Sequence, residues 1–143
     1  MSRLPRQLEH LRTGFTAEAV AAATCRAYAE HAAGAGRPNL AARWLALAAE
    51  KDQLAIELLH AAGKVETESG NLREAIAEEQ YENEVLYPRL IADMEHLGHP
   101  ELAALLGRLV ETQRRHQAAL GDLRRELTAS AHDVRGGAVA KAG

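Results

Sequence analysis

The chain has 143 residues, of which 47% are apolar and 3% aromatic, and its formal net charge is −3. This length suits one domain with a single core. The charge excludes the strongly basic field typical of nucleic-acid binding, and no apolar run approaches the roughly 20 residues of a membrane span. With a lone cysteine, Cys25, and no signal-peptide pattern, we expect a soluble cytoplasmic protein without nucleic-acid or membrane partners.

Four segments show helical periodicity, in chain order at residues 16–35, 39–62, 70–97 and 100–129. Thr16 and Asn71 are the expected N-caps of the first and third helices. Gly63 is a natural stop for the second helix, and Pro100 suits the first turn of the fourth.

Short links join the first helix to the second and the third to the fourth, which makes each pair antiparallel neighbours. A longer polar link separates the two pairs. The sequence therefore predicts an all-α, four-helix bundle made of two helical hairpins over residues 15–129. We expect residues 1–14 to be a separate N-terminal segment and residues 130–143 a flexible C-terminal tail.

An internal repeat supports two similar hairpins. The segments GRPNLAA at residues 36–42 and GHPELAA at residues 98–104 share the pattern G-x-P-x-L-A-A. The alternative to a duplication is two independent helix starts that share this pattern, because Gly and Pro are common where helices end and begin. A duplicated hairpin makes the further demand that equivalent positions carry equivalent chemistry.

Polar residues do lie at matching distances from the two turn glycines. Glutamates come 18 and 19 residues before the turns, at Glu18 and Glu79. The positions 15 and 18 residues after the turns are Lys51 and Leu54 in the first copy, and Gln113 and His116 in the second. Since both helices of a hairpin rise by ~1.5 Å per residue, these positions lie at one level. Polar groups inside an apolar stripe are costly unless paired or bound to metal, which predicts a shared central site.

The third and fourth helices resemble the rubrerythrin family. The resemblance rests on Glu79 and Glu82 followed by Tyr87-Pro88, and on the helix segment that ends at His116. The first half is similar more weakly, through Glu18 and the apolar stripe of the second helix. The resemblance covers residues 15–125 and implies a ferritin-like fold with a non-haem di-iron site, commonly linked to peroxide reduction and oxidative stress.

The resemblance also implies the ligand set and shows where it is altered. Its metal-site positions are Glu18, Glu79, Glu82, Gln113 and His116. Lys51 and Gln113 stand where the family has the two glutamates that bridge the irons, and Leu54 stands where it has a histidine. The chain has no Cys-x-x-Cys pair, so the rubredoxin-like domain of full rubrerythrins is expected to be absent.

We therefore expect an incomplete site with one iron or manganese ion rather than two, because two close cations need bridging anions. The catalytic candidates are Glu82 as a mobile ligand or proton carrier, Tyr87 as a hydrogen-bonding neighbour, and Lys51 as a base or nucleophile. The expected substrate is peroxide, dioxygen or a small oxidised compound, with electrons from a separate donor. A homodimer is expected.

The alternative is a metal-free bundle that serves as a binding or interaction module, in which Lys51, the carboxylates and His116 form an ionic network. Simpler interpretations exist for single residues. Glu18 alone reads as a surface acid near a helix start, His116 alone as a core histidine, and Cys25 as a small buried hydrophobe rather than a redox thiol.

Overall fold

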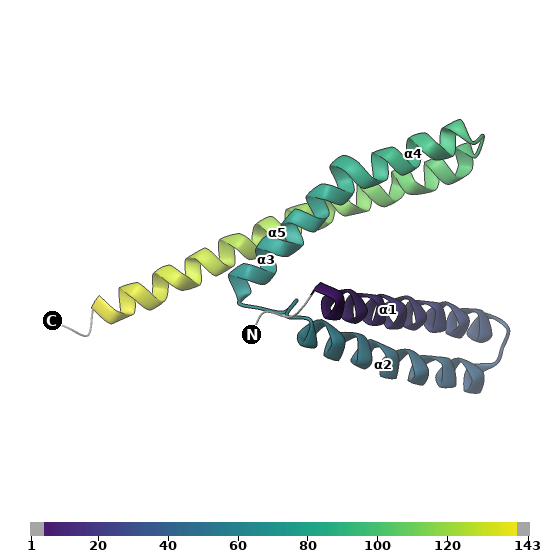
Figure 1. The fold of residues 1–143 in the computed structure, drawn as a ribbon, viewed down its shortest axis with the longest axis horizontal. Helices are drawn as coiled ribbons and strands as arrows, with labels where there is room; N and C mark the ends of the chain where they lie inside the picture. Colours follow the sequence, from purple (N-terminus) through teal and green to yellow (C-terminus); the bar gives the residue numbers. More distant parts are fainter. Residues whose placement is uncertain (1–4, 140–143) are drawn as a thin grey trace. The chain divides into compact units, whose positions relative to one another are not determined.

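The computed structural model describes residues 5–139, and every regular element within that range is a helix (Figure 1), which confirms the all-α class. None of these described helices is both long and apolar enough to cross a membrane. The chain forms two compact units, Met1–Val65 and Glu66–Gly143, and each is a helical hairpin. The single bundle over residues 15–129 stays a prediction.

The first unit consists of α1 (Pro5–Gly34) and α2 (Pro38–Ala61). The two helices pack along a seam of small buried side chains, namely Ala22, Cys25, Ala29, Ala32, Ala41, Ala48 and Ala55. The seam residues of α1 are separated by steps of three and four and those of α2 by steps of seven. This spacing keeps one face of a helix toward its neighbour. Cys25 therefore packs as the small hydrophobe that its surroundings favour.

The start of α1 differs from the prediction. The helix begins at Pro5, so Thr16 lies inside it and is not an N-cap. Once a helix has started, each added residue gains one hydrogen bond, so a cap-forming residue does not restart it. Gly14 does not break the helix, and a Cβ there would lie 3.2 Å from Leu58 Cδ1, so α2 approaches closely at this point. Residues 1–4 of the predicted N-terminal segment lie outside the described residues.

The second unit runs through α3 (Glu68–Tyr81), the π-helical turn η1 (Glu82–Leu86), α4 (Tyr87–His96) and α5 (Pro100–Val139). The N-cap of α3 is Thr67, whose hydroxyl accepts a hydrogen bond from the Gly70 N–H at 3.2 Å. The predicted cap Asn71 is wrong, because its side chain accepts from the Glu66 N–H at 2.7 Å instead.

The fourth predicted helix was expected to end at residue 129, but α5 continues to Val139. Four of residues 126–131 are good helix formers and none is proline or glycine, so nothing in the local sequence stops the helix at residue 129. The predicted tail is therefore helical over most of its length. Its last residues, 140–143, lie outside the described part of the chain.

The third predicted helix contains a π turn that periodicity did not predict. In η1, the Tyr87 N–H bonds the Glu82 carbonyl five residues back. Pro88 supplies the reason, because proline has no N–H and its ring clashes with the carbonyl four residues earlier. A π turn also holds one more residue than an α turn. Glu18 lies 18 residues before Gly36, whereas Glu79 lies 19 residues before Gly98, and the extra residue of the π turn accounts for this difference.

The two repeat turns match in their hydrogen bonds. Gly36 and Gly98 have φ of 70° and 79°. In each turn the glycine N–H bonds the carbonyl three residues back, at 3.0 and 3.1 Å, and the next N–H bonds the carbonyl five residues back, at 2.9 Å in both. These two hydrogen bonds, together with a glycine in the left-handed conformation, make up the Schellman motif. The shared G-x-P pattern therefore produces the same turn twice and starts α2 and α5 at Pro38 and Pro100.

Replacing Gly98 with alanine is expected to lower the free energy of unfolding by about 1 kcal/mol, because a side chain at positive φ is strained. No atom lies within 4 Å of the added Cβ, so the backbone alone causes the loss. Gly107 is the matched control: it lies inside α5 with the same open space around a Cβ, and alanine there should stabilise the helix by about 0.8 kcal/mol. Urea unfolding of both variants measures the difference, and equal effects would contradict this explanation.

Candidate metal site

In the first unit, the structure pairs Glu18 on α1 with Lys51 on α2. Lys51 Nζ donates to Glu18 Oε2 at 3.2 Å. The two side chains are 29% and 33% exposed, so this is a half-buried ion pair. Leu54, one turn further along α2, is 47% exposed and offers no polar atom.

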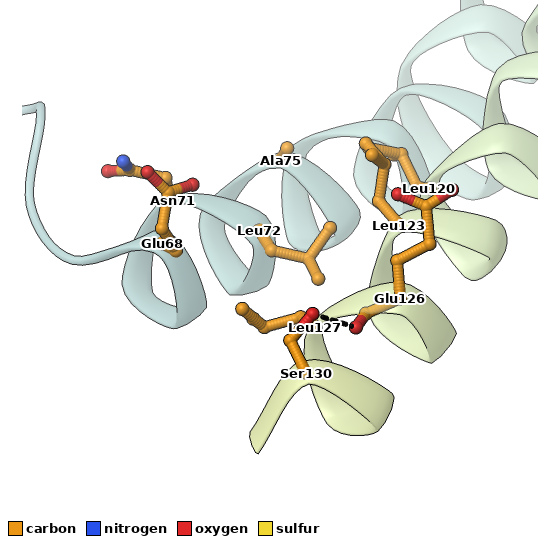
Figure 2. Close-up of a pocket in the computed structure, with 9 residues that line it drawn as sticks. All are labelled: Glu68, Asn71, Leu72, Ala75, Leu120, Leu123, Glu126, Leu127 and Ser130. Carbon is orange, nitrogen blue, oxygen red and sulfur yellow. Dashed lines mark hydrogen bonds between the residues drawn. The ribbon is translucent and has the colours of Figure 1, made fainter. Parts of the chain in front are cut away.

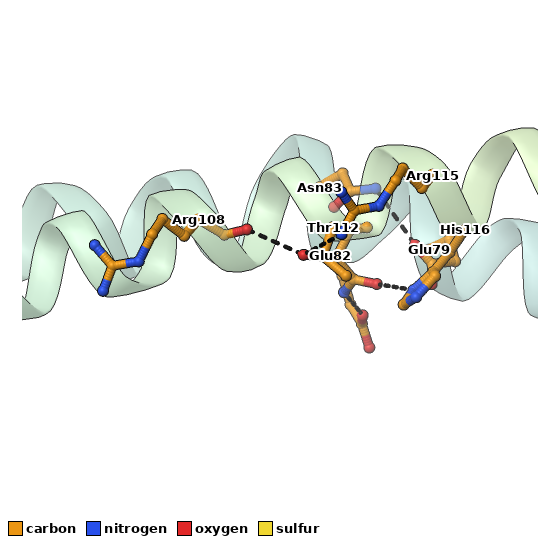
Figure 3. A network of polar contacts seen from close by, with 8 residues as sticks. Glu79, Glu82, Asn83, Arg108, Thr112, Arg115 and His116 are labelled. Atoms are coloured by element: carbon orange, nitrogen blue, oxygen red, sulfur yellow. Dashed lines mark hydrogen bonds and ion pairs between the residues drawn. The ribbon is translucent and has the colours of Figure 1, made fainter.

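In the second unit, Glu79 on α3 faces His116 on α5 (Figure 3). His116 Nδ1 lies 3.3 Å from Glu79 Oε1. The carboxylate is only 17% exposed, whereas the imidazole is 56% exposed. The pair therefore combines a mostly buried anion with a ring that solvent reaches.

Gln113 connects the polar groups of this unit. Gln113 is 7% exposed, and among the described residues it is the only polar one that is buried. Its Nε2 donates to Glu82 Oε2 at 2.6 Å, and its Oε1 lies 3.2 Å from His116 Nδ1. Gln113 thus holds Glu82 and His116 on the two sides of one amide.

An open pocket of about 290 Å³ lies at this group and is lined by Ala75, Glu78, Glu79, Glu82, His116, Ala119 and Leu120. Sequence reasoning did not recruit Glu78, because the whole segment is acidic. A larger pocket of about 420 Å³ lies further toward the start of α3, with Leu72, Leu123 and Leu127 among its lining residues (Figure 2). That pocket has no imidazole or thiol, so the metal-binding chemistry of this unit belongs to the smaller one.

Asn83, in the π turn, is a polar neighbour that sequence reasoning missed. Its Nδ2 donates a long bond of 3.4 Å to Glu79 Oε2. Its Oδ1 is buried and has no hydrogen-bond partner among the described residues. Buried acceptors are almost always satisfied, so the surroundings of Glu79 contain an oxygen that the protein itself leaves unsatisfied. The signal in the sequence was the spacing of four from Glu79, which places both on one helix face.

Tyr87 begins α4, and its backbone N–H closes the π turn. Its side chain is half-buried. Within the described residues the Tyr87 hydroxyl makes no hydrogen bond, so the role of this residue next to Glu82 is that of its backbone.

A centre of two metal ions does not fit these residues. Lys51 and Gln113, which the resemblance assigns to the two bridging positions, each use an N–H to donate to a carboxylate of their own hairpin. A protonated amine has no lone pair for a metal, and the neutral amide of Gln113 brings no negative charge to screen two close cations.

A single ion fits the donor chemistry of the second unit. An imidazole with carboxylates suits iron, manganese or zinc, and the neighbouring Asn83 carries a buried oxygen that accepts no hydrogen bond from the described residues. In the described part of the chain, no three His, Cys, Asp or Glu side chains are already grouped around one point. Glu79 and His116 are therefore the centre of the candidate site, and the present partner of Glu82 is Gln113.

A family model described as Rubrerythrin matches residues 49–124, just over half of the chain. The matched range contains Lys51 and Leu54 as well as every polar residue of the second-unit group. No curated protein matches the chain.

Proposed function

The chain belongs to the rubrerythrin family, and from that premise we propose that it is a divergent member whose second hairpin binds a single iron or manganese ion and reacts with peroxide or dioxygen. The observation that carries this proposal is the approach of His116 Nδ1 to Glu79 Oε1, at 3.3 Å, in a pocket that Glu82 also lines. A bound iron or manganese ion would supply a redox-active Lewis acid there.

Glu79 and His116 would hold the ion directly, because they come from opposite helices and face each other across the hairpin. Glu82 is the mobile member of the set. Its present partner is the neutral amide of Gln113, at 2.6 Å. Exchange of this one hydrogen bond frees the carboxylate to ligate or to carry a proton to a substrate in the pocket.

Gln113 orients the imidazole. With its Oε1 3.2 Å from His116 Nδ1 and its Nε2 on Glu82, the amide fixes both side chains at one level of the hairpin. A ligating histidine donates its other ring N–H to such an outer partner, so with Nδ1 on Gln113 the imidazole would present Nε2 to the ion. The exposed side of His116 leaves the pocket open to small substrates. Reduction of peroxide also needs electrons, which a separate donor would deliver.

Metal content tests the proposal first. After anaerobic loading with Fe(II) or Mn(II) and removal of excess ion, elemental analysis should find about one ion per chain, as expected for a single imidazole–carboxylate site. The Fe(II)-loaded protein should then consume peroxide or O₂ faster than the Glu79→Ala/His116→Ala double variant. About two ions per chain, or equal consumption by both proteins, would overturn the proposal.

One observation favours a second candidate, a metal-free bundle that acts as a binding module. Glu18 and Glu82 are already paired with N–H donors, and the described residues contain no ready three-ligand group. This candidate expects that a chelator leaves the melting temperature unchanged and that purified protein carries no metal. A chelator-induced drop in the melting temperature counts against it, because a bound ion stabilises only the folded state.

A further inference from the structure

The two hairpins are equivalent in geometry but not in chemistry. Counting from Gly36 and Gly98, whose turns have the same hydrogen bonds, Lys51 stands where Gln113 stands and Leu54 where His116 stands. The π turn absorbs the one residue by which the glutamate positions differ. The carboxylates that face these positions, Glu18 and Glu79, are therefore counterparts.

Both counterpart carboxylates are paired across their own hairpin at nearly equal distance. Glu18 Oε2 lies 3.2 Å from Lys51 Nζ, and Glu79 Oε1 lies 3.3 Å from His116 Nδ1. The partner in the first hairpin is an ammonium, which carries a full positive charge. The partner in the second is an imidazole, which can offer a lone pair to a cation.

We propose that Lys51 is an internal cation that takes, in the first hairpin, the place a metal ion takes in the second, and so limits the chain to one ion. Glu18 is 29% exposed, so its charge needs a partner, and the ammonium satisfies it without any ligand. The same ammonium repels a metal cation at that point and cannot coordinate one while protonated. Leu54 removes the nitrogen ligand that the second hairpin has.

This inference rests on the proposed metal site, and it assigns Lys51 the role of a counter-charge rather than a base. It also predicts how to build a second site. The triple variant Ala21→Glu/Lys51→Gln/Leu54→His gives the first hairpin the residues of the second, because Ala21 follows Glu18 by three as Glu82 follows Glu79. The reciprocal variant, Gln113→Lys, gives the second hairpin the residue of the first.

The test is the number of Mn(II) ions bound per chain, measured by isothermal titration and elemental analysis on folded full-length protein. Relative to wild type, the triple variant should bind about one ion more, and Gln113→Lys should lose the ion that wild type binds. Lys64→Gln, a charge loss outside the helices, is the control and should change neither number. A circular dichroism spectrum verifies folding, and the double variant Lys51→Gln/Leu54→His, which adds no buried charge, replaces the triple variant if that variant does not fold.

The outcomes separate this inference from the proposed function. If wild type binds one ion and the converted first hairpin adds none, or if Gln113→Lys keeps the ion, the role of Lys51 is overturned. If wild type binds none and the converted hairpin binds one, the proposed function fails, and of the inference only the exclusion of metal from the first hairpin by Lys51 stands. If neither protein binds Mn(II), both are overturned.

Discussion

Replacing His116 with alanine is expected to lower the affinity of the protein for Fe(II) or Mn(II) by more than ~100-fold, beyond the usual loss for an outer partner of a ligand. His116 is the one imidazole that lines the pocket, and its Nδ1 faces the Glu79 carboxylate, which is only 17% exposed. The free energy of unfolding of the metal-free protein should change by less than about 0.5 kcal/mol, because the ring is 56% exposed. Metal titration and urea unfolding measure the two effects separately.

His99→Ala is the matched control. His99 is 54% exposed, lies in the same hairpin at the turn before α5, and faces Glu101 at 3.4 Å rather than the pocket. Its loss should leave metal affinity unchanged. Equal affinities of His116→Ala and wild type would remove His116 from the site. A large loss of stability in His116→Ala would instead indicate a structural role that the exposed ring does not suggest.

Replacing Gln113 with glutamate is expected to destabilise the metal-free protein by about 1–3 kcal/mol, the cost of a buried acceptor that loses its donor. Gln113 Nε2 lies 2.6 Å from Glu82 Oε2, so the substitution sets two carboxylates against each other at a site that is 7% exposed. A divalent ion relieves this repulsion. The variant should therefore bind Mn(II) more tightly than wild type and gain more stability from it. At an ion concentration of ~100 Kd that gain reaches about 2.7 kcal/mol.

The control is Gln117→Glu, an exposed position on α5 one turn after Gln113. It adds the same charge to the same helix but not to the pocket. Urea midpoints with and without Mn(II) should shift little in this variant. If Gln113→Glu has the stability and metal response of Gln117→Glu, the amide of Gln113 does not hold Glu82 as the structure shows it.

Much of the fold could be read from the sequence because it depends on local signals. The two G-x-P segments predicted the turns that end α1 and α4 and start α2 and α5, since a left-handed glycine and a first-turn proline are properties of single residues. The helical periodicity predicted every long helix. The N-caps failed at Thr16 and Asn71, because a capping side chain acts only where a helix happens to begin, and that is decided by the residues around it.

The candidate residues of the site were also within reach of the sequence. Counting from the turn glycines placed Glu18 level with Lys51, and Glu79 level with His116, because helical rise is constant. The π turn could not be predicted from helical periodicity, because it arises from a clash between Pro88 and the carbonyl four residues before it. Asn83 was missed for a related reason, because it lies in that turn, whereas Glu78 was passed over because the whole segment is acidic.

From the residues alone, two similar helical hairpins could be predicted, each with a carboxylate and a nitrogen-bearing side chain at one level. The pairing of these groups is visible only in the folded chain: Lys51 with Glu18, His116 with Glu79, and Gln113 between His116 and Glu82. Gln113 and Glu82 are 31 residues apart in the chain, and Lys51 and Glu18 are 33 apart. Which donor meets which acceptor depends on the rotation of each helix about its axis, and that rotation is fixed by packing between helices and not by spacing along one of them.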